Sequence, residues 1–238
     1  HVNFANAEAG SNVDTWTIQD YAGAGADFEC NDISVSRGFV VYSSRSVKIN
    51  GHVTISGDYT VSKFYGNTSS AVELAGATKE INGAGGAQWG QRFQNLTISG
   101  SYTLTEGYLD IYTTFNLTGS LAVTDGTICF ESITTDGITI SGTLSAASAK
   151  TINWYPNASV SHKALTLPAN FTLYLCSTST SDITFTFTGA LSVYALNIGQ
   201  YYNDHTTTLS MGSNTLTVTT NLTLGSAGAT SIGSLVIT

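Results

Sequence analysis

Hydrophobic and polar residues alternate along most of this chain, in runs of four to seven residues. Clear examples are Val47/Ile49, Leu96/Ile98 and Leu173/Leu175. Alternation with a period of two places one face of a strand inside a protein and the other face outside. Gly, Asn, Asp and Ser separate the runs at positions typical of turns. No stretch keeps helical spacing over three turns, so the pattern predicts an all-β fold with almost no helix.

The alternating segments also contain a sequence repeat. Residues 53–61 return as residues 96–104 with six of nine positions identical, and residues 138–144 form a third copy. Glycines at 57, 76, 100, 119 and 142 are spaced 19, 24, 19 and 23 residues apart. This indicates a coil of about 21 residues, as in a β-solenoid or a stack of β-arches. An antiparallel sandwich is the alternative, but it has no reason to repeat its sequence. Alternation alone does not distinguish a closed solenoid from open β-arches, because both use the same pattern.

The first residues differ from the rest in charge. Six of the sixteen acidic residues precede Arg37, the first basic residue. We therefore divide the chain into an acidic N-terminal segment, 1–45, acting as a cap or docking arm, and a repeat domain, 46–238. Asp27, Glu29 and Asp32 are candidate calcium ligands, but they lack the ligand rhythm of a calcium loop. No metal site is predicted.

The composition excludes several classes of partner. Charged residues make up 10% of the chain, against about 25% in a typical soluble domain, and the net charge is −8. Nucleic acid is not expected as a partner, because phosphate binding needs clustered Lys and Arg. No apolar run reaches the roughly 20 residues that span a bilayer. The chain begins at His1, which fits either a trimmed chain or a mature N-terminus left by signal cleavage. We expect the latter, and hence an extracellular location.

Evidence for catalysis is weak in the sequence. The four histidines share no neighbourhood, and neither H-E-x-x-H nor G-x-S-x-G occurs. We therefore predict no enzyme activity and no cofactor. Carboxylates one coil apart could flank a glycosidic bond, and two pairs have this separation: Asp110 with Glu131, and Glu106 with Asp125. The alternative is that these four acids lie at solvated turns.

Two sets of side chains are candidates for covalent modification. An odd number of cysteines favours an inter-chain disulfide or buried thiols; the candidates are Cys30, Cys129 and Cys176. Six N-x-[ST] sequons are candidate glycosylation sites, and for Asn95, Asn116 and Asn221 the alternative is a turn asparagine in the left-handed conformation. The sequons lie at Asn67, Asn95, Asn116, Asn157, Asn170 and Asn221.

Two further segments are candidate contact surfaces. The chain's last residues include the apolar run Leu235, Val236 and Ile237, with no polar cap. Such an edge invites pairing with another chain unless the N-terminal segment covers it. Residues 201–205 are predicted to form a polar loop with paired tyrosines, which is either an ordinary turn with exposed tyrosines or a candidate contact for a glycan or receptor.

The Asn-Leu-Thr-Ile-x-Gly coil, the abundance of Ser, Thr and Gly, and the scarcity of charge carry a resemblance. From about residue 46 to the end, the chain resembles extracellular β-solenoid surface proteins of bacteria and archaea. It also resembles, more distantly, the amyloid-like sheath proteins of methanogenic archaea. The second resemblance implies glycosylated subunits that stack through β-arches, with the cysteines as candidate cross-links.

The leading hypothesis is a structural protein. It forms a homopolymer through stacked β edges, with covalent glycans as further partners, in an extracellular sheath, layer or fibre. The alternatives are a polysaccharide-degrading β-helix enzyme and an adhesin or receptor-binding fibre.

Overall fold

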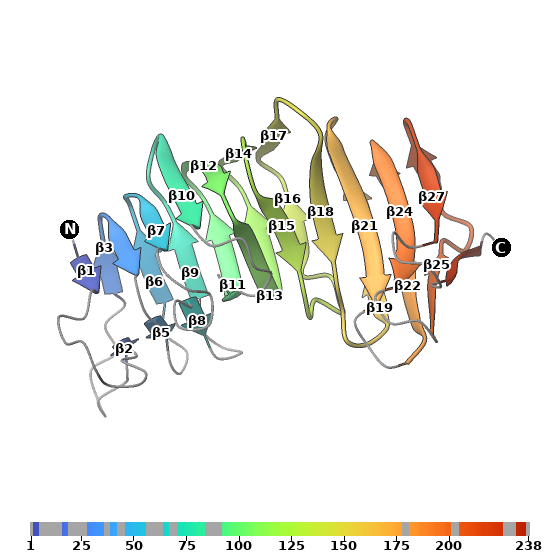
Figure 1. Cartoon of the computed structure of the whole chain (residues 1–238), viewed down its shortest axis with the longest axis horizontal. Helices are drawn as coiled ribbons and strands as arrows, with labels where there is room; N and C mark the ends of the chain where they lie inside the picture. Colours follow the sequence, from blue (N-terminus) through green and yellow to red (C-terminus); the bar gives the residue numbers. More distant parts are fainter. Residues whose placement is uncertain are drawn as a thin grey trace.

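The chain folds into a β-solenoid. The computed structural model describes residues 2–4, 16–18, 28–35, 39–41, 46–55, 64–66, 71–83, 92–177, 181–200, 205–225 and 232–236. Its strands lie side by side along the long axis from one terminus toward the other (Figure 1). About seven turns stack with coils roughly 23 residues apart, and the described residues contain no helix. The predicted all-β solenoid is therefore confirmed, with a coil slightly longer than the predicted 21 residues.

Every strand pair in the described residues is parallel, which rules out the antiparallel sandwich. The strands form five sheets. The eleven-stranded sheet contains β3 (Phe28–Cys30), β6 (Ser46–Ile49), β9 (Ala71–Leu74), β11 (Arg92–Ile98), β13 (Tyr108–Leu117), β15 (Thr127–Phe130), β16 (Ile138–Ile140), β18 (Lys150–Trp154), β21 (Phe171–Ser177), β24 (Ala195–Gln200) and β27 (Leu222–Leu224). The seven-stranded sheet contains β1 (Val2–Phe4), β4 (Ile33–Val35), β7 (Val53–Ile55), β10 (Lys79–Gly83), β12 (Ser101–Glu106), β14 (Ser120–Val123) and β17 (Thr143–Ala146).

Three smaller sheets complete the solenoid. The N-terminal one contains β2 (Trp16–Ile18), β5 (Phe39–Val41) and β8 (Phe64–Gly66). The four-stranded C-terminal sheet contains β19 (Val160–His162), β22 (Ile183–Phe187), β25 (Thr206–Ser210) and β28 (Ile232–Val236). The three-stranded C-terminal sheet contains β20 (Leu165–Thr166), β23 (Leu191–Val193) and β26 (Leu216–Val218). Within the described ranges there is no helix of the length and apolarity that a bilayer crossing requires.

Each coil in the middle of the rod has three faces. The first part of β13, residues 108–111, pairs with β15, and its last part, residues 115–117, pairs with β16. Because β15 and β16 follow one another within one coil, β13 passes from one face to the next. β11 shows a register shift at the corresponding place, after Phe93. We call the ladder through residues 108–111, β15, β18, β21, β24 and β27 the first ladder. The ladder ending in β16 is the second, and the seven-stranded sheet is the third.

Inward side chains stack in columns along the axis. In the second ladder Val72 pairs with Val47 on one side and Leu96 on the other, and Leu96 pairs with Phe115. All four are buried, with exposed fractions of 4% or less. Removing apolar surface from water contributes about 25 cal/mol for each Å², so these columns are the main source of stability and fix which residues face inward.

A column of glycines forms the corner between the second and third ladders. A Cβ on Gly100 would lie 2.1 Å from the carbonyl oxygen of Gly76, and one on Gly119 would lie 2.0 Å from that of Gly100. Gly142 approaches Gly119 in the same way. At these three positions the corner leaves no room for a side chain, which explains the regular glycine spacing. The column continues through Gly51, and the predicted member Gly57 lies outside the described residues.

The two segments most alike in sequence lie on different faces, which corrects the repeat alignment. Val53 belongs to the third ladder, where it pairs with Ile33 and Ile81. Leu96 belongs to the second ladder. The third copy lies on the same face as the second, since Ile138 pairs with Phe115, which in turn pairs with Leu96. Strands on both faces have the same alternation, so a local match could not tell one face from the other.

The described parts of residues 1–45 pair into the solenoid. β1 pairs with β4 and β4 with β7, while β3 pairs with β6. These strands are rungs of the same sheets as the repeat domain. The cap or docking role of the acidic segment stays a prediction, because most of its acids lie outside the described residues.

The second and third ladders are interrupted at one level, while the first is continuous. β15, β18 and β21 pair in sequence. β16 and β17 are the last strands of their ladders, and β19 and β20 begin new sheets. β16 and β20 lie near one another without strand pairing. We call this interruption, formed by residues 134–146 and 160–170, the seam.

Candidate functional site

The strongest predicted acid pair is buried rather than open to solvent. Asp110 on β13 and Glu131 after β15 have exposed fractions of 0% and 4%. Asp110 pairs in register with Cys129. Burial raises the pKa of the Cys129 thiol, and the charges of both carboxylates add to this effect. Cys129, and not Glu131, is therefore the register partner of Asp110, so the predicted stacking of the two acids is wrong by two residues, although both charges act on the same thiol. A glycosidase also needs a sugar and water between its carboxyl groups, and such burial leaves neither in reach.

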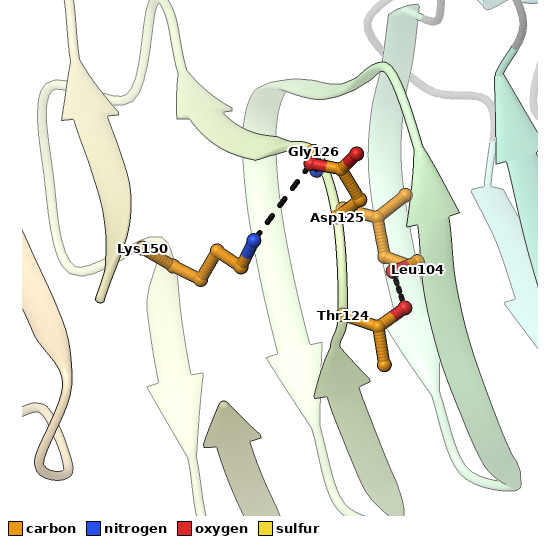
Figure 2. A network of polar contacts seen from close by, with 5 residues as sticks. All are labelled: Leu104, Thr124, Asp125, Gly126 and Lys150. Carbon is orange, nitrogen blue, oxygen red and sulfur yellow. Dashed lines mark hydrogen bonds and ion pairs between the residues drawn. The ribbon is translucent and has the colours of Figure 1, made fainter. Parts of the chain in front are cut away.

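The second acid pair lies at exposed turns, as the alternative reading expected. Glu106 and Asp125 are both exposed. Asp125 Oδ1 accepts the N–H of Gly126 at 2.8 Å and lies 3.7 Å from Lys150 Nζ (Figure 2). Beside it, Thr124 Oγ1 donates to the carbonyl of Leu104 at 3.2 Å. These contacts hold the turn, and an ion pair made by so exposed a carboxylate contributes little.

Two of the candidate calcium ligands are engaged in the N-terminal coils. Glu29 Oε1 accepts from Asn50 Nδ2 at 2.7 Å. Asp32 Oδ1 accepts the backbone N–H of His52 at 2.8 Å. Asp27 lies outside the described residues. Among the residues that the structure describes, no three His, Cys, Asp or Glu side chains converge as a metal site.

All three candidate cross-linking cysteines are free and buried inside the subunit. Cys30 packs in the main core, whereas Cys129 and Cys176 share a separate cluster with Tyr155. Burial raises the pKa of the Cys30 and Cys176 thiols to about 11. A protonated, buried thiol is a poor nucleophile. This placement favours the core-thiol alternative, and inter-chain disulfides stay a prediction.

The candidate glycosylation sites differ in accessibility. Asn157 and Asn221 are exposed. Asn95 and Asn116 lie within strands and are half-buried, and Asn221 has no positive φ, so the left-handed alternative is wrong for all three. Asn170 does adopt that conformation, with φ of 70°, and its Nδ2 donates to the Ala146 carbonyl at 2.9 Å. Asn67 lies outside the described residues. Glycosylation itself stays a prediction.

The predicted assembly edge has an apolar neighbour that sequence reasoning missed. Leu235 and Val236 belong to β28, which pairs with β25 at the edge of its sheet. Ile237 and the loop at 201–204 lie outside the described residues. β27 lies at the edge of the first ladder, and its Leu222 and Leu224 are 43% and 50% exposed. Their register partners Leu196 and Ile198 are fully buried. The alternation in Asn221-Leu-Thr-Leu was the signal for this surface.

A hollow of about 400 Å³ lies on the seam, between β16 and residues 162–166. Asp136, His162 and Lys163 line it together with Thr139 and Thr166. Asp136 Oδ1 accepts the Lys163 N–H at 2.6 Å, and its Oδ2 lies 3.1 Å from Lys163 Nζ. Desolvation acts to raise the pKa of Asp136, but these contacts outweigh it and lower the pKa below its ordinary value.

His162 lies at the inner side of the seam. It is 2% exposed, and its ring meets Trp154 and Phe187 at centroid distances of 5.5 and 5.9 Å. Neither ring nitrogen forms a hydrogen bond of regular geometry with a described residue, although the backbone groups of Lys163 and Ile138 lie close enough to act to raise the pKa of the ring. Burial lowers the pKa of His162, although the Asp136 charge acts in the opposite direction. Sequence reasoning did not find the contact between Asp136 and His162. The two residues lie one coil apart in the chain, and only the stacking of the coils brings them together.

The chain matches no family model, no curated protein and no solved structure.

Proposed function

We propose that this chain is a structural subunit that stacks end to end, through its strand edges, into an extracellular sheath, layer or fibre. The exposure of Leu222 and Leu224 carries this proposal. Both lie at the end of inward-facing columns, and their neighbours in the preceding coil, Leu196 and Ile198, are fully buried. Exposed apolar surface beside an unpaired strand edge is a template for another strand. Covering it with a further coil would bury both leucines.

The solenoid geometry supports a second copy as the source of that coil. β1, β2 and β3 are edge strands at one end of the rod, and β26, β27 and β28 are edge strands at the other. All pairs along the rod are parallel and follow the same coil order. The first coil of one copy therefore continues the last coil of another without reversing direction. Head-to-tail contacts that do not close into a ring generate filaments.

The extracellular location and the glycan coat are part of the same proposal. A chain with only 10% charged residues needs another source of solubility. Sugars on exposed sequons such as Asn157 and Asn221 would provide it. The resemblance to extracellular solenoid proteins points the same way.

Electron microscopy of native material tests assembly directly. We expect tubes, sheets or fibres with a repeat near 4.8 Å along the stacking direction. The double variant Leu222→Glu/Leu224→Glu should give dispersed, folded rods, because buried carboxylates would lie in the new interface. The control Thr223→Glu changes the outward face of the same strand and should still assemble. Dispersed wild-type rods, or unchanged assembly of the double variant, would refute the proposal.

The two alternatives have less support. Asp110 and Glu131 are too well covered for hydrolysis of a polysaccharide. An activity that a polysaccharide panel detects in the wild type and that Asp110→Asn removes would nevertheless establish the enzyme. For an adhesin, the expected sign is trimerisation with receptor binding at residues 201–205.

A further inference from the structure

At the seam, side-chain contacts join neighbouring coils, whereas elsewhere along the rod backbone hydrogen bonds of the strand ladders join them. At its start the Ser161 N–H still reaches the Thr134 carbonyl at 2.9 Å. The next bond across, from the Lys163 N–H, goes to the Asp136 side chain instead of a carbonyl. At the far end, Asn170 Nδ2 reaches the Ala146 carbonyl. Between these two side-chain contacts lies the hollow. Few bonds therefore have to break for the seam to open.

The first ladder would hold the rod together during such an opening. β15 pairs with β18 through three residues, from Ile128 to Phe130, and β18 pairs with β21 through five. Neither set of bonds crosses the seam. The two halves of the rod would thus stay joined on one face while the other two faces separate. Local opening of this kind needs much less free energy than global unfolding.

His162 gives the seam a titratable group in an environment that favours the neutral ring. Lys163 follows it in the chain, and across the seam the ring faces Asp136. These two charges pair with one another at 3.1 Å, and of the two the Asp136 charge acts more strongly on His162, raising its pKa without outweighing the effect of burial. β18 and β22 present the rings of Trp154 and Phe187. Trp154 offers no acceptor, since its indole N–H donates to the Ile133 carbonyl at 2.9 Å.

We propose that the seam is an acid-sensitive opening in the rod: protonation of His162 separates β16 and β17 from β19 and β20 while β15, β18 and β21 stay paired. A buried imidazolium loses its hydration, and the backbone groups of Lys163 and Ile138 together with the Asp136 charge offset this loss only in part. Opening of the seam exposes both ring nitrogens to water and so restores the hydration of the charged ring. The proton comes from solvent and returns to it when the seam closes, so the change is reversible.

The sign and size of the pH dependence follow from linkage. In the closed seam the pKa of His162 lies below its ordinary 6.5, and in the open seam it returns to that value. The open state therefore binds more protons between these two pKa values. Above pH 6.5 the opening equilibrium is constant. Below it the open population rises, by up to tenfold for each pH unit, until the pKa of the closed state is reached.

Hydrogen exchange of the intact chain, followed by mass spectrometry and corrected for intrinsic rates, measures this opening. Peptides covering 138–146 and 160–167 should show the rise below pH 6.5, whereas a peptide covering β21 should not. His162→Phe should abolish the rise, because a phenyl ring fits against Trp154 and Phe187 without a proton. His52→Phe is the matched control and should leave the rise intact, since His52 lies far from the seam in the N-terminal coils, where its Nδ1 accepts from the Glu80 N–H.

Three results would overturn the proposal. Exchange at the seam could be independent of pH, it could rise equally in His162→Phe, or it could rise together with exchange in β21, which would mean global unfolding. If His162→Phe does not fold, an NMR titration of the wild type decides. The His162 ring signals should titrate at the same pH as the amide signals of residues 160–167, and separate midpoints would refute the coupling.

Discussion

Asp136 binds Lys163 twice, through the backbone N–H at 2.6 Å and through the ammonium group at 3.1 Å. The first contact replaces a ladder bond at the point where two strands of neighbouring coils diverge. The second is an exposed ion pair of low value. The pair therefore stabilises the seam mainly through the backbone contact.

We expect Asp136→Ala to lower the thermal midpoint and to speed exchange of the Lys163 amide, because that amide loses its acceptor. Asp136→Asn retains an oxygen acceptor and should have a smaller effect. Asp182 is a matched control, since its Oδ1 accepts the Thr206 N–H at 2.7 Å beside a continuous ladder. Asp182→Ala should change exchange less, and an equal effect would contradict the role of the seam.

Gly100→Ala should be strongly destabilising. The added Cβ would lie 2.1 Å from the Gly76 carbonyl oxygen, a backbone atom held by two strands. Overpacking of this kind costs about 1–3 kcal/mol or more, measurable as a loss of unfolding free energy in urea.

The control for this prediction is Gly212→Asn. A Cβ there meets nothing within 4 Å, and the left-handed φ of 53° suits asparagine. We expect a change within about 0.5 kcal/mol. Similar losses in both variants would show that the corner is not close-packed.

Tyr102→Phe tests the hydroxyl that ties three coils together. Tyr102 Oη accepts the Gly76 N–H at 3.2 Å and lies 2.9 Å from the carbonyl oxygens of both Ile49 and Gly51, which share its single proton. Removing it leaves a buried N–H without its acceptor, which costs about 1–3 kcal/mol. Tyr194→Phe is the control, because the Tyr194 hydroxyl has no hydrogen-bond partner among the described residues. Urea unfolding of both variants should separate them clearly.

The cysteines should be unreactive in the folded subunit. Burial raises the pKa of the Cys30 and Cys176 thiols to about 11 and also raises that of Cys129. At pH 8 almost no thiolate is present, and a thiol reagent should label less than one group in the native protein and all three after unfolding. Rapid native labelling, or a non-reducing gel ladder that collapses with reductant, would instead support inter-chain disulfides.

The sequence by itself determined the class of fold and much of its corner. Alternation such as Leu96/Ile98 fixes which side chains point inward, because this property is local to one strand. The spacing of Gly76, Gly100, Gly119 and Gly142 identified the corner where each coil meets the carbonyl of the one before.

Only the tertiary structure decided register, burial and the seam. Residues 53–55 and 96–98 carry the same local pattern on different faces, because alternation does not specify a partner strand. Whether Asp110 is open or covered depends on chain packed over it, which no spacing reveals. The seam arises where β16 and β20 fail to pair. Pairing between coils is set by the geometry of the whole turn, so the neighbours of Asp136 and His162 followed from no local signal.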